Sequence, residues 1–125
     1  MNNFDDDILI LPDIQIGRSV GAKFKNYDIE TPDGDIIQLT EGSRITNVEV
    51  MAGKGRNRQI DIKDVLVDKY GGNADEWQKV KGLGYVDVGG ESYRAELHWY
   101  QEPTVGKVEW KLKPQRGGAY FVYED

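Results

Sequence analysis

The side chains best suited to acid and base chemistry lie in the last third of the sequence. His98 is the only histidine in 125 residues, and Glu96 lies two positions before it. Imidazole exchanges its proton near neutral pH. An imidazole and a carboxylate at alternate positions of a strand project from the same face. The pair therefore predicts a site for general acid and base catalysis.

Apolar and polar residues alternate around His98 and predict a strand over residues 93–101, followed by a second over residues 107–113. If the two strands pair as a hairpin, their polar faces coincide. The polar face is expected to hold Arg94, Glu96, His98, Tyr100, Lys107, Glu109, Lys111 and Lys113. The core face is expected to hold Tyr93, Ala95, Leu97, Trp99, Val108, Trp110 and Leu112.

These residue types suit metal-independent cleavage of RNA by its own 2'-hydroxyl. His98 or Glu96 is expected to be the base and the other the acid. Stabilisation of the phosphate charge is expected from Arg94, Lys107 or Lys111. Tyr100 is expected to stack on a base or to donate a hydrogen bond. A solvated face of any one-sided antiparallel sheet has the same alternation, so that alternative stays open.

A second group of cations lies in the glycine-containing segment AGKGRNRQ, residues 52–59. Lys54, Arg56 and Arg58 are expected to contact phosphate, with a plain solvated basic turn as the alternative. The segment lacks the spacing of a Walker loop, so nucleotide hydrolysis is not indicated. One histidine and no cysteine disfavour a transition-metal site, and no metal or cofactor is expected.

The elements that must position these residues begin with a predicted β-hairpin over residues 27–39, turning at Pro32, Asp33 and Gly34. A strand is expected at residues 45–50. A helix is predicted over about residues 62–70, capped by Asp61 and ended by the glycine pair at 71–72. The spacing of Asn73 and Glu76 is that of a capping box and predicts a second short helix.

From residue 82 onward the apolar residues recur at every second position. Strands are expected at residues 85–88, 93–101, 107–113 and 119–124, separated by turns. The predicted fold is α+β, with one or two short helices packed on the core face of a four-stranded antiparallel meander and an N-terminal β-hairpin extension. The polar face of the sheet is expected to stay open.

Length and composition predict one α+β domain over residues 20–125, preceded by an acidic arm at residues 1–19. The net charge of −6 argues against a nucleic-acid ligand, but it comes entirely from residues 1–41, with nine acidic and three basic residues. Residues 42–125 hold thirteen of each. No apolar run is long enough to span a membrane and no signal peptide is recognised, so no membrane partner is expected.

Two runs resemble a known domain: EGSRITNVEVMAGKG at residues 41–55 and YGGNADEWQKVKGLGYVDVGGESYRAELHWYQEPTVGKVEWKLK at residues 70–113. They resemble the C-terminal domain of phage minor head (MuF-like) and related prophage proteins, over about residues 20–113. Such domains are grouped with ribonuclease toxins of the barnase, EndoU, RelE and colicin superfamily. The resemblance implies a barnase-like sheet, with His98 and Glu96 in acid and base roles and Arg94, Lys107 and Lys111 on the phosphate.

The leading expectation is therefore a phage-associated ribonuclease effector that acts on RNA, in the host cytoplasm or associated with the virion. A non-enzymatic module is the main alternative, using the same face or the basic segment to bind a protein partner such as an immunity or host protein. A phage-encoded inhibitor of a host defence protein is a third, since an acidic surface can mimic nucleic acid.

Overall fold

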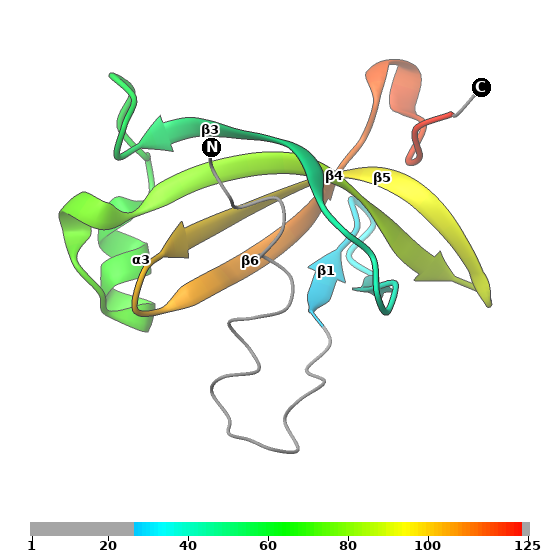
Figure 1. The fold of residues 1–125 in the computed structure, drawn as a ribbon, viewed down its shortest axis with the longest axis horizontal. Helices are drawn as coiled ribbons and strands as arrows, with labels where there is room; N and C mark the ends of the chain where they lie inside the picture. The colour runs from blue at the N-terminus through cyan, green and yellow to red at the C-terminus, as the bar shows by residue number, and fades with distance from the viewer. Residues whose placement is uncertain (1–26, 124–125) are drawn as a thin grey trace.

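The computed structural model describes residues 27–123 and consists mostly of β-strands with one α-helix in that range (Figure 1). This confirms the α+β class. The strands are β1 (Asp28–Glu30), β2 (Ile36–Leu39), β3 (Thr46–Gly53), β4 (Gln78–Val88), β5 (Glu91–Glu102) and β6 (Gly106–Lys113). The helix is α3 (Lys63–Tyr70), η2 (Ala74–Glu76) is a single 3-10 turn, and η3 (Arg116–Gly118) is a kinked turn in which Gly117 has φ of 87°.

The strands close into a barrel. Their order is β2-β1-β6-β5-β4-β3, and β2 also pairs with β4, so that five strands form a ring. All pairings are antiparallel except the parallel contact between β1 and β6. β4 reaches both β2 and β3 because it has 11 residues: its first half pairs with β3 and its last residues with β2.

The expected open meander of four strands is therefore present only in part. β4, β5 and β6 do form an antiparallel meander. The strand expected at residues 119–124 is not formed at residues 119–123, which follow η3 without pairing as a strand. There Phe121 stacks on Tyr93 with ring centroids 4.7 Å apart, and the Val122 amide donates to the Arg94 carbonyl. Aromatic packing and this backbone hydrogen bond, without strand pairing, hold the segment.

The inside of the barrel is the main core. Ala95, Leu97 and Trp99 point into it as predicted, and Trp99 stacks on Trp110 at 4.7 Å. Tyr93 was expected there too, but it lies at the strand's open end and is 38% exposed. Because the barrel encloses this face, α3 does not cover it. The helix packs outside one end, where its buried Leu66 joins a second cluster with Trp77 (Figure 1).

A β-bulge in β6 changes which side chains face outward. His98 pairs with Lys111 and Tyr100 with Val108, so β6 has one more residue than β5 between these pairs. Glu109 lies in the bulge with φ of 59°. Before the bulge the alternation of β6 is reversed. Val108 was predicted to lie in the core, but it pairs with Tyr100 and faces outward with it. Lys107 was predicted to lie beside His98, but it pairs with the buried Gln101 and faces the other side of the sheet.

Glycines explain why residues 78–84 were not predicted as part of a strand. Gly82 and Gly84 face the barrel interior and weaken the strand signal. A Cβ atom at Gly82 would lie 2.7 Å from the Ile45 side chain, so the close crossing of the chain before β3 requires glycine there. The second predicted helix is only the turn η2, in which the Asn73 side chain accepts the Asp75 amide.

The other local predictions agree with the structure apart from one cap. The hairpin of β1 and β2 is confirmed, with Gly34 at φ of 93° in its turn. It was expected to be an extension of the sheet, but it closes the barrel, because β1 pairs with β6 and β2 with β4. The predicted helix is confirmed and ends before Gly71, which has φ of 84°. Asp61 is not its cap, because the N-cap residue is Ile62 and no side chain caps it. The acidic arm at residues 1–19 lies outside the described residues.

Within the described range, no helix has the length and apolar character needed to cross a membrane.

Candidate functional site

His98 lies in the middle of the outer face of the meander. Lys81 of β4 is its partner on one side and Lys111 of β6 is its partner on the other. Directly opposed residues of antiparallel strands have Cβ atoms about 5 Å apart. The barrel therefore places the imidazole between two lysines that come from different strands.

Glu96 orients the imidazole. Its Oε2 lies 2.9 Å from His98 Nε2, and its Oε1 accepts a hydrogen bond of 3.0 Å from the Gln115 side chain. Partial burial alone would raise the pKa of Glu96, but the hydrogen bonds from His98 and Gln115 outweigh burial and lower it. An ionised carboxylate only accepts hydrogen bonds, so Nε2 carries the proton and Nδ1 is the basic nitrogen.

The surroundings of His98 favour the neutral form of its imidazole. Burial lowers its pKa, Glu96 acts in the opposite direction, and the positive charges of Lys113 and Lys79 lower it further. The net result is a pKa below the usual value of 6.5. A neutral imidazole at neutral pH is the form that accepts a proton, so His98 suits the role of a base.

Four lysines surround this dyad: Lys79, Lys81, Lys111 and Lys113, which we call the lysine face. Among the described residues, Lys79, Lys111 and Lys113 form no ion pair with a carboxylate, and Lys81 approaches Glu49 only at 3.6 Å. Lys79 lies over the Tyr100 ring, 6.0 Å from its centroid. The face thus has cationic groups available for an anion, next to an aromatic ring.

Two hollows flank His98 on this surface. One, of about 340 Å³, is lined by Lys79, His98, Tyr100 and Lys111 together with Ile62 and Glu109. The other, of about 470 Å³, is lined by Lys81, Glu96, Leu83 and residues of β3. The imidazole and its carboxylate therefore lie between two places where a ligand can be held.

The carboxylate of Glu109 belongs to the frame of the site. It accepts hydrogen bonds from the Tyr70 hydroxyl at 2.6 Å and from Lys69 at 2.9 Å, which connect α3 to the bulge of β6. These bonds lower the pKa of Glu109.

Burial, with the nearby charges of Asp61 and Glu109, raises the pKa of Tyr100, which therefore stays protonated at neutral pH.

The structure thus brings together four of the six predicted catalytic residues: Glu96, His98, Tyr100 and Lys111. Arg94 also faces outward, but it lies four residues before His98 on β5. Its guanidinium lies 5.7 Å from the centre of the Tyr85 ring. Lys107 is on the other side of the sheet because of the bulge. Sequence reasoning did not assign Lys79, Lys81 and Lys113 to the site, although Lys79, Val80 and Lys81 carry the polar-apolar alternation that signals a strand.

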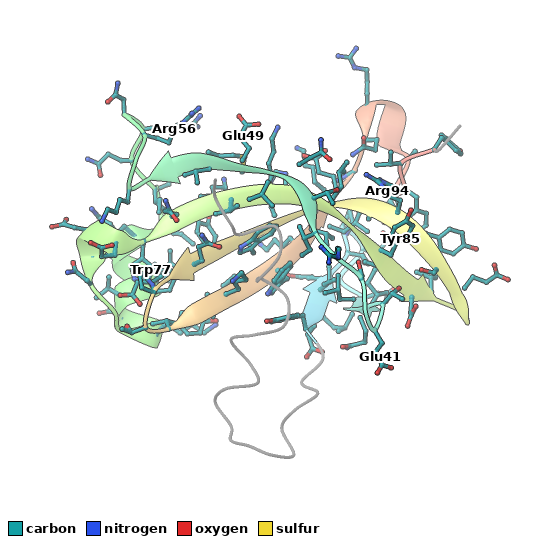
Figure 2. The ribbon with its side chains drawn as sticks, viewed as in Figure 1. Glu41, Glu49, Arg56, Trp77, Tyr85 and Arg94 are labelled. Carbon is teal, nitrogen blue, oxygen red and sulfur yellow. The ribbon has the colours of Figure 1, made fainter. Side chains whose placement is uncertain are left out.

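The basic segment forms a separate feature. Lys54 is bound to Glu76 at 2.8 Å, and the amides of Gly53, Lys54 and Arg56 donate to carbonyls of the chain. These amides are therefore not available to a phosphate. A hollow of about 210 Å³ at this segment, with Arg56 and Arg58 in its lining, shares no lining residue with the hollow at His98. Arg56 lies near the tip of the loop, away from Arg94 and Tyr85 (Figure 2).

Comparison with known protein families, curated proteins and solved structures gives no match for this chain.

Proposed function

We propose that the lysine face binds RNA and that His98 cleaves it as a general base. The observation that carries this proposal is the dyad of His98 and Glu96, 2.9 Å apart, held between Lys81 and Lys111 from the two neighbouring strands. Attack on a phosphodiester requires a base that is neutral at pH 7 and cations beside it. Among the described residues Lys111 forms no ion pair with a carboxylate, and Lys81 approaches Glu49 only at 3.6 Å.

In the proposed reaction, Nδ1 of His98 takes the proton of the 2'-hydroxyl as its oxygen bonds to the adjacent phosphorus. The bond from phosphorus to the 5'-oxygen breaks, and the ammonium group of Lys81 or Lys111 donates a proton to the leaving oxygen. The products are a 2',3'-cyclic phosphate and a 5'-hydroxyl. The lysines also stabilise the negative charge that develops on the phosphate oxygens.

Glu96 has a different role in this proposal from the one expected from sequence. It is ionised and bonded to His98, so it holds the ring and fixes its tautomer instead of exchanging a proton with RNA. Glu96 is therefore a positioning residue. Replacement by glutamine keeps the shape but not the charge, and we expect Glu96→Gln to alter the pH profile of cleavage.

The resemblance to phage and prophage domains supplies the biological setting of the proposal, a ribonuclease effector acting in a host cell or carried by a virion. The feature that supports a barnase-like sheet is the antiparallel meander of β4, β5 and β6 with its outward polar residues. The closed ring made with β1 and β2 is a departure from an open sheet.

The test is cleavage of a fluorescent single-stranded RNA by the full chain, with the product ends identified by mass. We expect a cyclic phosphate end, and a rate at least about a hundredfold lower for His98→Ala. Lys107→Ala is the matched control, because this lysine lies on the other side of the sheet, and it should cleave within about twofold of wild type. Absence of cleavage by the wild type, or equal rates for wild type and His98→Ala, would overturn the proposal.

A non-enzymatic protein-binding module is the second candidate. It is favoured by the exposed aromatic side chains at the end of the barrel away from α3, where Tyr93 is stacked on Phe121. Exposed aromatic residues are common in protein interfaces. A folded wild-type chain that neither cleaves nor binds RNA would favour this candidate over the first.

A further inference from the structure

Four consecutive cross-strand pairs of β4 and β5 point outward along the barrel. In order they are Lys79 with Tyr100, Lys81 with His98, Leu83 with Glu96, and Tyr85 with Arg94. We call these four pairs the outer ladder. Because a strand rises about 3.3 Å per residue, successive pairs are about 6.6 Å apart. This repeat is comparable to the spacing of phosphates along an extended single strand of nucleic acid.

The two ends of the outer ladder have the same chemistry. At one end the Lys79 ammonium lies 6.0 Å from the centre of the Tyr100 ring. At the other end the Arg94 guanidinium lies 5.7 Å from the centre of the Tyr85 ring. Figure 2 shows Tyr85 and Arg94 side by side on the half of the barrel away from Trp77. Each end thus combines a cation for phosphate with an aromatic ring on which a base can stack.

The middle of the ladder contains the reactive dyad and both hollows. Lys81 and His98 form one rung, and Leu83 and Glu96 form the next. The hollow beside Tyr100 includes His98, and the hollow beside Leu83 includes Lys81 and Glu96. A ligand that follows the ladder would therefore cross the dyad and occupy a hollow on each side of it.

We infer that the outer ladder is a track for single-stranded RNA of about four nucleotides, one at each pair. This inference rests on the proposed function and specifies its substrate class. Bases at the two ends stack on Tyr100 and Tyr85, and the phosphate to be cleaved lies at Lys81 and His98. Stacking on these rings needs unpaired bases, so a duplex is not the ligand. Among the described residues Lys79 forms no ion pair with a carboxylate and Lys81 approaches Glu49 only at 3.6 Å, which favours a polyanion as the occupant.

Binding is measured separately from cleavage, with 2'-O-methyl oligonucleotides that have no free 2'-hydroxyl. The probes are fluorescent single strands of two, four and eight nucleotides and a duplex of eight pairs, read by anisotropy with the full chain. We expect the tetramer to bind at least about tenfold more tightly than the dimer and nearly as tightly as the octamer. Tyr85→Ala should weaken tetramer binding by about tenfold.

Two variants control for damage to the fold. Tyr85→Phe keeps the ring and should bind the tetramer like wild type. Tyr93→Ala removes an exposed tyrosine from the opposite side of β5 and should also leave binding unchanged. The inference is overturned if Tyr85→Ala binds the tetramer normally, or if the duplex binds as tightly as the single strand.

These outcomes are distinguishable from failure of the proposed function. If the wild type binds the tetramer through Tyr85 but leaves unmodified RNA intact, the track stands and catalysis by His98 fails. If the wild type cleaves RNA through His98 but Tyr85→Ala has no effect on binding, catalysis stands and the four-nucleotide track fails.

Discussion

Two glutamates of β5, six positions apart, have opposite environments. Glu102 is only 4% exposed and accepts four hydrogen bonds, from the amides of Asn73, Thr104 and Val105 and from the Thr104 hydroxyl. The side chain of Glu96 is 24% exposed and is bonded to the side chains of His98 and Gln115. One carboxylate is surrounded by its own chain, whereas the other is partly exposed beside an imidazole.

The difference shows how the same residue type can serve the fold or a site. Three of the four donors to Glu102 are backbone amides, which are fixed once the turn after β5 and the segment after α3 are formed. Gly72 approaches so closely that a Cβ atom there would lie 2.7 Å from the Glu102 side chain. Glu96, in contrast, has two side-chain partners, His98 and Gln115, and lies near the charge of Lys81. Glu102 therefore joins separate parts of the chain, and Glu96 orients the His98 imidazole.

The pKa values of both carboxylates are lowered, but by different partners. Burial alone would raise the pKa of Glu102, but the bonds from Asn73, Thr104 and Val105 outweigh burial and lower it to about 2. The pKa of Glu96 is also lowered, and its main partner is itself a titratable group. Both lowered pKa values make folding depend on pH, but protonation of Glu96 also removes the acceptor that orients the His98 imidazole.

Replacing Glu102 is expected to have the largest effect on stability. Glu102→Ala leaves buried donors without an acceptor and should lower the free energy of unfolding by about 3 kcal/mol, measured by urea denaturation. Glu91→Ala, at the exposed start of β5, is the control and should change it by less than about 0.5 kcal/mol. If both variants unfold alike, the structural role given to Glu102 is wrong.

Acid should reduce the contribution of Glu102 over a defined range. Its pKa is lower in the folded than in the unfolded chain, so the unfolded chain binds more protons and stability falls as the pH falls. The contribution is complete above about pH 4.5 and is lost as the pH falls from there through about 2. The difference in unfolding free energy between wild type and Glu102→Ala should therefore narrow across this range in urea titrations. A constant difference would contradict the assignment.

The smallest expected effect is on the pKa of His98, the partner of Glu96. Lys113→Ala removes a positive charge that lowers the pKa of His98, so that pKa should rise, as followed by NMR of the imidazole protons. Lys107→Ala is the control and should leave the titration unchanged, because Lys107 is on the opposite side of the sheet. A larger shift from Lys107→Ala than from Lys113→Ala would show that the bulge does not separate the two lysines.

Local pattern predicted the elements near the site better than it predicted their pairing. The alternation over residues 93–101 was enough to place Leu97 and Trp99 inside and His98 outside. The bulge was missed because Val108, Trp110 and Leu112 alternate without interruption and no glycine marks Glu109. The first half of β4 was missed because Gly82 and Gly84 resemble turn residues, although they are needed for close packing inside the barrel.

The sequence by itself determined the α+β class, the hairpin of β1 and β2, the extent of α3 and the outward direction of Glu96, His98 and Tyr100. These depend on the period of the residues and on glycines at turns, which are local properties. The alternation also placed Lys111 and Lys113 on this face, but only the tertiary structure decided the full set of cations around His98. Pairing of β4 with β5 added Lys79 and Lys81 and the bulge removed Lys107, since strand register depends on contacts between residues distant in sequence.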